Sequence, residues 1–205
     1  SLDKAWKIAD LITKLYQDKG YFLSRAFIPA QEIGSGGTFR IRVVEGYIGT
    51  VSIDELVRKN HIINSLIAKL QSEKPSNIKT LESVLLQLND LPGLSFRSVI
   101  ERLQDYKMEE GAVQLSLVKE DKKGSGQVIA DNYSSMYLGP YEGIVSYEDS
   151  FLPMQKTSLL YLNSDPLQKL KYYSINHVIA LAPGLSLEIS GGSTSAKPGY
   201  TLELE

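Results

Sequence analysis

The sequence predicts an α+β fold, in which a helix with two short strands and a module of the order strand-helix-helix-strand-strand are followed by an antiparallel β meander. Two observations lead to this prediction. Up to about residue 120, apolar residues at helical spacing alternate with short β-prone runs. From Gly124 onward helical periodicity disappears, and segments of about ten residues alternate apolar and polar positions between turn residues.

A first helix is predicted over residues 2–19, where apolar residues recur at helical spacing and form one stripe. Lysines and aspartates occupy the other face, and Gly20 fits a C-terminal stop. We expect the apolar stripe to be the face that packs into the core. Its residues are Ala5, Ile8, Ala9, Ile12, Leu15 and Tyr16.

Two short strands follow this helix. Residues 23–28 are β-prone and end at Pro29, and the glycines among residues 34–37 provide a flexible turn. Residues 38–45 then alternate apolar and polar side chains. This alternation predicts that one face of the strand packs on the core and the other meets solvent. The expected core residues are Phe39, Ile41 and Val43, and the expected solvent-facing residues are Arg40 and Arg42.

The next segment predicts a complete strand-helix-helix-strand-strand module. Apolar spacing indicates two helices, which are separated at Pro75 and stop before Pro92 and Gly93. Ser76 or Asn77 can cap the second of them. The elements are a strand at 46–54, helices at 55–72 and 78–91, and strands at 96–105 and 112–119, with a long charged connection at 103–111.

The last part of the chain predicts an up-and-down arrangement of antiparallel strands, with one apolar and one polar face. The length and alternation of each segment are typical of transmembrane β-strands, although a single such segment is a weak signal. The predicted strands are 127–135, 141–149, 156–164, 170–182, 185–193 and 200–205.

Composition excludes several classes of function. A formal net charge of −2 gives no general attraction to nucleic acid, so no nucleic-acid partner is expected. The chain has no cysteine, which excludes disulfides, thiol nucleophiles and cysteine-based zinc sites. No apolar run approaches the ~20 residues that a membrane helix needs.

No set of residues predicts catalysis, and we expect no catalytic residues, no metal site and no cofactor. His61 and His177 lie on unrelated elements and in no metal-binding spacing. Glu109 and Glu110 fall in a turn, where solvated charges are the simpler interpretation. The glycines of residues 34–37 join two strands, so they do not cradle a phosphate at a helix N-terminus.

One stretch also resembles a known family. A helix, then GY-x-LSRA-x-IP-x-Q-x-I, a glycine-rich turn and R-x-R-V-V-EGYIG resemble the polypeptide-transport-associated (POTRA) domain of two-partner secretion transporters. These are outer-membrane pores that export haemolysins and filamentous adhesins. Further along the chain, Leu-x-x-Leu-Pro-Gly ends the second helix of the complete module as it does in the family, and residues 131–132 and 171–174 resemble barrel strands.

The resemblance implies three domains. Residues 1–46 would be the C-terminal part of a first POTRA domain, whose first strand and first helix would lie upstream. Residues 47–120 would be a second POTRA domain, and residues 121–205 the N-terminal strands of an outer-membrane β-barrel. The chain begins at Ser1 without a signal peptide, so we expect a piece of a longer precursor.

The resemblance also implies a function and a location. The protein would lie in the bacterial outer membrane, with lipid around its barrel strands and its POTRA domains in the periplasm. Its partner would be a secreted exoprotein, received unfolded and passed to the pore. An edge strand can pair with an extended polypeptide, and an electrostatic guide would come from the basic first module. The expected binding residues are Leu23, Ser24, Arg25, Ala26, Phe27 and Ile28, beside the groove to the first helix.

Two alternatives remain at this point. A barrel-assembly factor of the same superfamily would share the modules and the barrel but act on other clients. A soluble carbohydrate-binding or enzymatic β domain with an α+β appendage belongs to a different class. Convergent carboxylates in a pocket would favour the second alternative.

Overall fold

The computed structural model describes residues 2–32, 38–102, 110–120, 124–164 and 169–197. The chain divides into two compact units. One contains Ser1–Asn89 and Phe96–Glu120, and the other contains Asp90–Ser95 and Asp121–Glu205. Each unit has its own sheets, so we describe them separately.

The first unit begins with helix α1 (Leu2–Asp18), close to the predicted range. Gly20 ends it as the sequence predicts, with a left-handed φ of 90° that favours glycine. Its N–H donates to Gln17 O at 2.8 Å, and the next N–H, from Tyr21, reaches back to Tyr16 O at 2.9 Å. These bonds satisfy carbonyl groups at the end of the helix.

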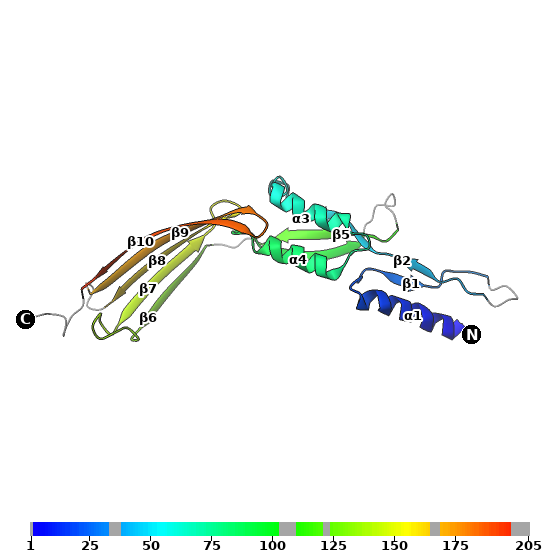
Figure 1. The fold of residues 1–205 in the computed structure, drawn as a ribbon, viewed down its shortest axis with the longest axis horizontal. Helices are drawn as coiled ribbons and strands as arrows, with labels where there is room; N and C mark the ends of the chain where they lie inside the picture. The colour runs from blue at the N-terminus through cyan, green and yellow to red at the C-terminus, as the bar shows by residue number, and fades with distance from the viewer. Residues whose placement is uncertain (1, 33–37, 103–109, 121–123, 165–168, 198–205) are drawn as a thin grey trace, which may run out of the picture. The chain divides into compact units, whose positions relative to one another are not determined.

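Strands β1 (Arg25–Phe27) and β2 (Arg42–Val44) form an antiparallel pair beside α1 (Figure 1). Both are shorter than the predicted 23–28 and 38–45. Pro29 has no N–H to donate, so the ladder stops before it. The Gln31 amide then takes the place of a strand partner, since Nε2 donates to Arg40 O at 2.9 Å and Oε1 accepts from Arg40 N–H at 2.8 Å. The predicted glycine turn at 34–37 lies outside the described residues.

The prediction that Val43 of the second strand faces the core is wrong. Val43 is 38% exposed, while its neighbour Val44 is buried. Phe39 and Ile41 are half-buried, and Arg40 and Arg42 are exposed as predicted. Val44 is buried because it lies against Gly111 of the next module, a long-range contact that alternation within one strand does not reveal.

The second module follows the predicted order of elements. Strand β3 (Tyr47–Ser52) pairs in parallel with β5 (Ala112–Lys119), and β4 (Phe96–Arg102) pairs antiparallel on the other side of β5. Helices α3 (His61–Ser72) and α4 (Ile78–Asn89) pack on each other and on this sheet (Figure 1). The most deeply buried apolar side chains of this core are Ile48, Ile62, Ile63, Leu70, Val84, Leu88 and Leu115.

The helix predicted over 55–72 is divided in two. Helix α2 (Glu55–Arg58) ends after one turn, and α3 begins at His61. Asn60 causes the break, because its side chain accepts from Ile62 N–H at 2.8 Å and so caps a new helix. The sequence named Ser76 or Asn77 as the cap of α4. Asn77 takes this role by accepting from Lys79 N–H at 3.0 Å.

A buried hydrogen-bonded joint links the first module to the second. Ser24 Oγ accepts from Gly46 N–H at 3.2 Å, and Gly46 O accepts from Ser76 N–H at 3.0 Å. Ser76 Oγ in turn accepts from Ile48 N–H at 3.0 Å. A Cβ on Gly46 would lie 2.4 Å from Leu23 O, so only glycine fits this close approach.

The second unit contains one five-stranded antiparallel sheet in the order β10-β9-β8-β7-β6 (Figure 1). All four pairs of neighbouring strands are sequential, as the predicted up-and-down meander requires. The strands are β6 (Ser125–Asp131), β7 (Glu142–Asp149), β8 (Gln155–Ser164), β9 (Leu170–Ala182) and β10 (Leu185–Ala196).

Two strand ends of this sheet differ from the prediction. The first strand stops at Asp131 rather than at residue 135, because the Asp131 side chain accepts from Tyr133 N–H at 3.1 Å and starts a turn. The last described strand continues to Ala196, past the predicted residue 193, because Leu170 of β9 is its partner there. The predicted strand at 200–205 lies outside the described residues, and so do residues 103–109 of the long connection.

We predict that Ser76→Ala lowers the free energy of unfolding of the first unit by about 1–3 kcal/mol, because it leaves the buried Ile48 N–H without an acceptor. Ser72→Ala is the matched control, since the exposed Ser72 hydroxyl bonds only to Lys69 O of its own helix. Its effect should stay within about 0.5 kcal/mol. Urea unfolding followed by helical circular dichroism measures both, because all described helices lie in this unit. Equal losses in the two variants would contradict the joint.

Candidate functional site

The predicted binding segment of residues 23–28 contains a strand only at Arg25, Ala26 and Phe27. Ser24 is buried, and its hydroxyl belongs to the joint between the modules. Its N–H donates to Tyr21 O at 3.1 Å, which keeps this residue in a turn. Leu23 and Ile28 flank the strand and are half-buried.

The second module shows which side of β1 is the outer edge. There β5 is the central strand, with β4 on one side and β3 on the other. By the order of elements, β1 corresponds to β4 and β2 corresponds to β5. A strand equivalent to β3 would therefore pair with β2 and would leave the outer side of β1 unpaired.

Helix α1 reaches the middle of this outer edge. The Ala26 N–H donates to Thr13 Oγ1 at 2.9 Å, and the same hydroxyl lies 3.4 Å from Ala26 O. Because alternate residues of a strand point their backbone groups to opposite sides, Ala26 directs its groups away from β2 while Arg25 and Phe27 direct theirs toward it. The sequence offered no signal for this contact, because the pattern of residues in a helix does not predict which group a threonine hydroxyl will bond to.

The apolar stripe of α1 is only partly a core face, so that part of the prediction is wrong. Ala5 and Ala9 are buried, whereas Ile8 and Leu15 are about half-exposed. Ile12 and Tyr16 are half-buried. The helix turns its small residues toward the strands because close packing at β1 admits alanine there, and larger side chains remain at the margin. Leu11 and Trp6 are exposed as well.

Charges around the edge are exposed and partly paired. The predicted basic residues Lys4, Lys7, Lys14, Lys19, Arg25, Arg40 and Arg42 are all exposed. Arg42 forms an ion pair with Glu110, and Tyr16 donates a hydrogen bond to Glu45 Oε1 at 2.9 Å. Exposed pairs of this kind add little stability. The hydrogen bond to Glu45 raises the pKa of the Tyr16 hydroxyl, because it favours the protonated form.

One face of the five-stranded sheet is apolar and exposed. Residues that lie directly opposite each other on neighbouring strands share a face, so the register assigns Tyr147, Leu159 and Ile175 to one row. Val145, Tyr161 and Tyr173 form the next row on the same face. All six are more than 40% exposed, and Val128 in the second row is 78% exposed.

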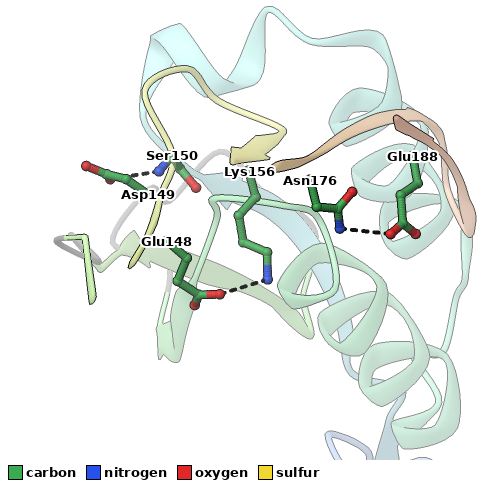
Figure 2. A network of polar contacts seen from close by, with 6 residues as sticks. All are labelled: Glu148, Asp149, Ser150, Lys156, Asn176 and Glu188. Carbon is green, nitrogen blue, oxygen red and sulfur yellow. Dashed lines mark hydrogen bonds and ion pairs between the residues drawn. The ribbon is translucent and has the colours of Figure 1, made fainter. Parts of the chain in front are cut away.

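The opposite face is mainly polar. Its row of Ser125, Glu148, Ser158, Asn176 and Ser190 crosses all five strands. Lys156 Nζ lies 3.4 Å from Glu148 Oε2, and Asn176 Nδ2 donates to Glu188 Oε1 at 2.8 Å (Figure 2). Much of this face lines a hollow of about 700 Å³.

One row of the polar face is an exception. Ile129, Ile144, Leu162 and Tyr172 lie opposite one another across four strands, and this row ends at Thr194 of β10. These four residues lie far apart in the sequence, so no single strand reveals the row. The register between strands is needed to see it.

The residues considered for chemistry stay apart. His61 is an exposed residue at the start of α3, and His177 Nδ1 lies 2.9 Å from Thr157 Oγ1 in the other unit. Within the described ranges, no three histidine, aspartate or glutamate side chains gather as a metal site would require. Among the helices that the structure describes, none is both long and apolar enough to cross a membrane.

Comparisons with known proteins identify the first module. Residues 6–46 match the model of the ShlB-type POTRA domain. Over 148 residues the chain is 25% identical to the heme/hemopexin transporter protein HuxB of Haemophilus influenzae strain 86-028NP. This alignment covers 69% of the chain and 25% of that protein, so the chain spans about a quarter of the length of the curated relatives it matches.

Solved structures share the fold. CdiB from Escherichia coli superposes with a TM-score of 0.64 at 16% identity, over 92% of this chain and 35% of that one. CdiB from Acinetobacter baumannii superposes with a TM-score of 0.52 at 17% identity, over 91% and 35%. Together the comparisons confirm the predicted α+β fold class and the resemblance to two-partner secretion transporters. The predicted outer-membrane location with periplasmic POTRA domains agrees with this likeness.

We predict that Glu45→Gln lowers the raised pKa of Tyr16 toward its ordinary value. Because the folded pKa is raised, the stabilisation from this hydrogen bond is complete below the unfolded value of about 10 and is lost as pH rises through the folded value. Nuclear magnetic resonance of labelled tyrosine rings measures the titration, with Tyr16→Phe to assign the signal. Glu55→Gln on α2 is the control and should change nothing; an equal shift in the control would contradict the assignment.

Proposed function

We propose that this chain is the part of a two-partner secretion transporter that receives an unfolded exoprotein in the periplasm and leads it to a barrel pore. Its parts would be the end of a first POTRA domain at 1–46, a second POTRA domain at 47–120 and the first barrel strands at 121–205. The client would pair with β1 and then pass along the polar face of the barrel wall.

The observation that most supports this proposal is the division of the five-stranded sheet into two faces. A soluble domain rarely exposes so large a continuous apolar surface. A barrel wall requires it, since one face meets lipid and the other meets the lumen. The apolar rows led by Tyr147 and Val145 fit the lipid side, and the Glu148 row fits the lumen.

The edge of β1 suits a client that must move on. Strand addition uses backbone groups that every polypeptide has, so it binds many sequences with modest selectivity. The strand is only three residues long, which keeps the binding weak. A client that was held tightly would not continue into the pore, so weak and repeated binding fits transport.

The alternatives have less support. A barrel-assembly factor would share the general architecture, but the family match at residues 6–46 is of the ShlB type. A soluble carbohydrate-binding or enzymatic domain would need convergent polar groups in a closed pocket. In the described part of the meander, Glu148 and Glu188 instead bond to Lys156 and Asn176 on an open sheet face.

We predict that Ala26→Pro in the full-length transporter reduces secretion of its exoprotein. The outward donor at mid-strand belongs to Ala26, and proline removes that donor. Its ring also displaces Thr13 Oγ1, which lies 2.9 Å from the Ala26 nitrogen, so the amount of folded transporter must be measured beside secretion. Secreted exoprotein in the medium is measured by immunoblot against the amount of transporter in the outer membrane. Ala30→Pro is the matched control, since Ala30 is exposed and lies beyond the strand.

Normal secretion by Ala26→Pro would place client capture elsewhere. The next candidate would then be β4, the corresponding edge of the second module. A fall in secretion with Ala30→Pro as well would mean that proline acts through the fold rather than through the edge.

We also predict that Ile175→Arg destabilises the full-length barrel in a lipid bilayer by about 2–4 kcal/mol if the position lies at the bilayer midplane. Ser174→Arg, one residue away on the polar face, should cost clearly less. Denaturant titration of the folded barrel in lipid vesicles measures both free energies. Similar costs, or a greater cost at Ser174, would show that the assignment of the two faces is wrong.

A further inference from the structure

The outer edge of β1 is not simply open. At its centre, the Ala26 N–H donates to Thr13 Oγ1 at 2.9 Å, and this hydroxyl is partly shielded from solvent. On the N-terminal side of Ala26, the Ser24 N–H donates to Tyr21 O at 3.1 Å and is held in a turn. On the C-terminal side, β1 ends at Phe27. An added strand therefore meets an edge whose central donor is already engaged.

The hydroxyl of Thr13 has one proton and two possible acceptors. Ala9 O lies 3.0 Å from Oγ1, within the same helix, and Ala26 O lies 3.4 Å away. The shorter bond uses the proton inside the helix, so the hydroxyl holds Ala26 mainly by accepting from its N–H. The Ala26 carbonyl is then weakly occupied, and an incoming N–H can reach it first.

We propose that Thr13 is a latch on the client-binding edge: its hydroxyl holds the Ala26 N–H in the free transporter and is displaced when a client strand adds to β1. This inference rests on the proposed function. The latch is the single hydrogen bond between Ala26 N–H and Thr13 Oγ1. It protects the edge from unwanted pairing, which exposed strand edges invite, yet it opens easily because one such bond contributes little net stability.

The second module offers a contrast. Its corresponding edge strand, β4, has a helix side chain only at its first residue, where Phe96 N–H donates to Asn89 Oδ1 at 2.7 Å. That bond occupies the backbone donor of the first residue of β4, and the described residues show no such helix contact at the middle of the strand. Only in the first module, among the described edges, does a preceding helix hold the mid-strand donor.

The test uses the full-length transporter and two variants. Thr13→Val keeps the shape of the side chain but removes the hydroxyl, and Thr13→Ser keeps the hydroxyl. Amide hydrogen exchange at Ala26 reports the latch. We expect exchange at Ala26 to be faster in Thr13→Val by at least several-fold, and near wild type in Thr13→Ser. Exchange in β5 serves as a control, because general destabilisation would accelerate it too.

Reduced and carboxymethylated lactalbumin, a permanently unfolded polypeptide, is the binding probe. We expect Thr13→Val to bind it about 2- to 10-fold more tightly than wild type, since displacing the latch no longer opposes binding. Thr13→Ser should bind like wild type, and bound probe should slow exchange at Ala26 in every form.

The outcomes separate the latch from the proposed function. Equal exchange at Ala26 in Thr13→Val and Thr13→Ser would overturn the latch, and so would probe binding by Thr13→Val that is no tighter than by Thr13→Ser. If exchange is faster in Thr13→Val but no form binds the probe, the client site itself is refuted, and with it the role of the bond as a gate.

Discussion

Every strand edge presents backbone donors and acceptors that need partners, and this requirement organises the whole chain. In the first module, the Thr13 hydroxyl of α1 accepts from the central N–H of β1. Beyond Pro29, where the strand pairing stops, the Gln31 side-chain amide bonds to the backbone of Arg40. At the joint, buried serines satisfy the backbone where one module passes into the next. Such an edge can be covered by other groups of the protein or can bind another chain, and in the proposed function an unfolded client binds there.

The same requirement explains the meander. In a bilayer, strands survive only when their backbone groups pair with neighbouring strands, and closure into a barrel removes the last edges. The five described strands satisfy one another in sequence, with β6 and β10 at the two ends. The pairing then decides on which face of the sheet each side chain lies, because residues opposite one another on neighbouring strands share a face. The row from Ile129 to Tyr172 differs from its neighbours on the polar face, because it is apolar and lies between two polar rows.

The sequence predicted the ends of elements and the alternating faces, because neighbouring residues decide these features. Gly20 ends a helix, Pro29 ends a strand, and alternation from Gly124 onward marks a two-faced sheet. A long-range contact explains one difference, because Val44 is buried by Gly111. Two other differences come from local side-chain bonds that apolar periodicity does not show: Asn60 divides a predicted helix through a capping bond, and Asp131 turns the chain early. The candidate site shows the same limit: the β-prone run at residues 23–28 was visible in the sequence, whereas its true length and the contact with Thr13 depend on how helix and strand pack.

The central claim is that an unfolded client pairs with the edge of β1. Its most direct measurement is photo-crosslinking in secreting cells, with a benzophenone amino acid at Arg25, an exposed residue of β1, and at the exposed Arg58 of α2 as the matched position. The account predicts a crosslinked product between the transporter and its exoprotein from position 25 and little or none from position 58. No product at position 25 during active secretion, or equal products at both positions, would contradict it.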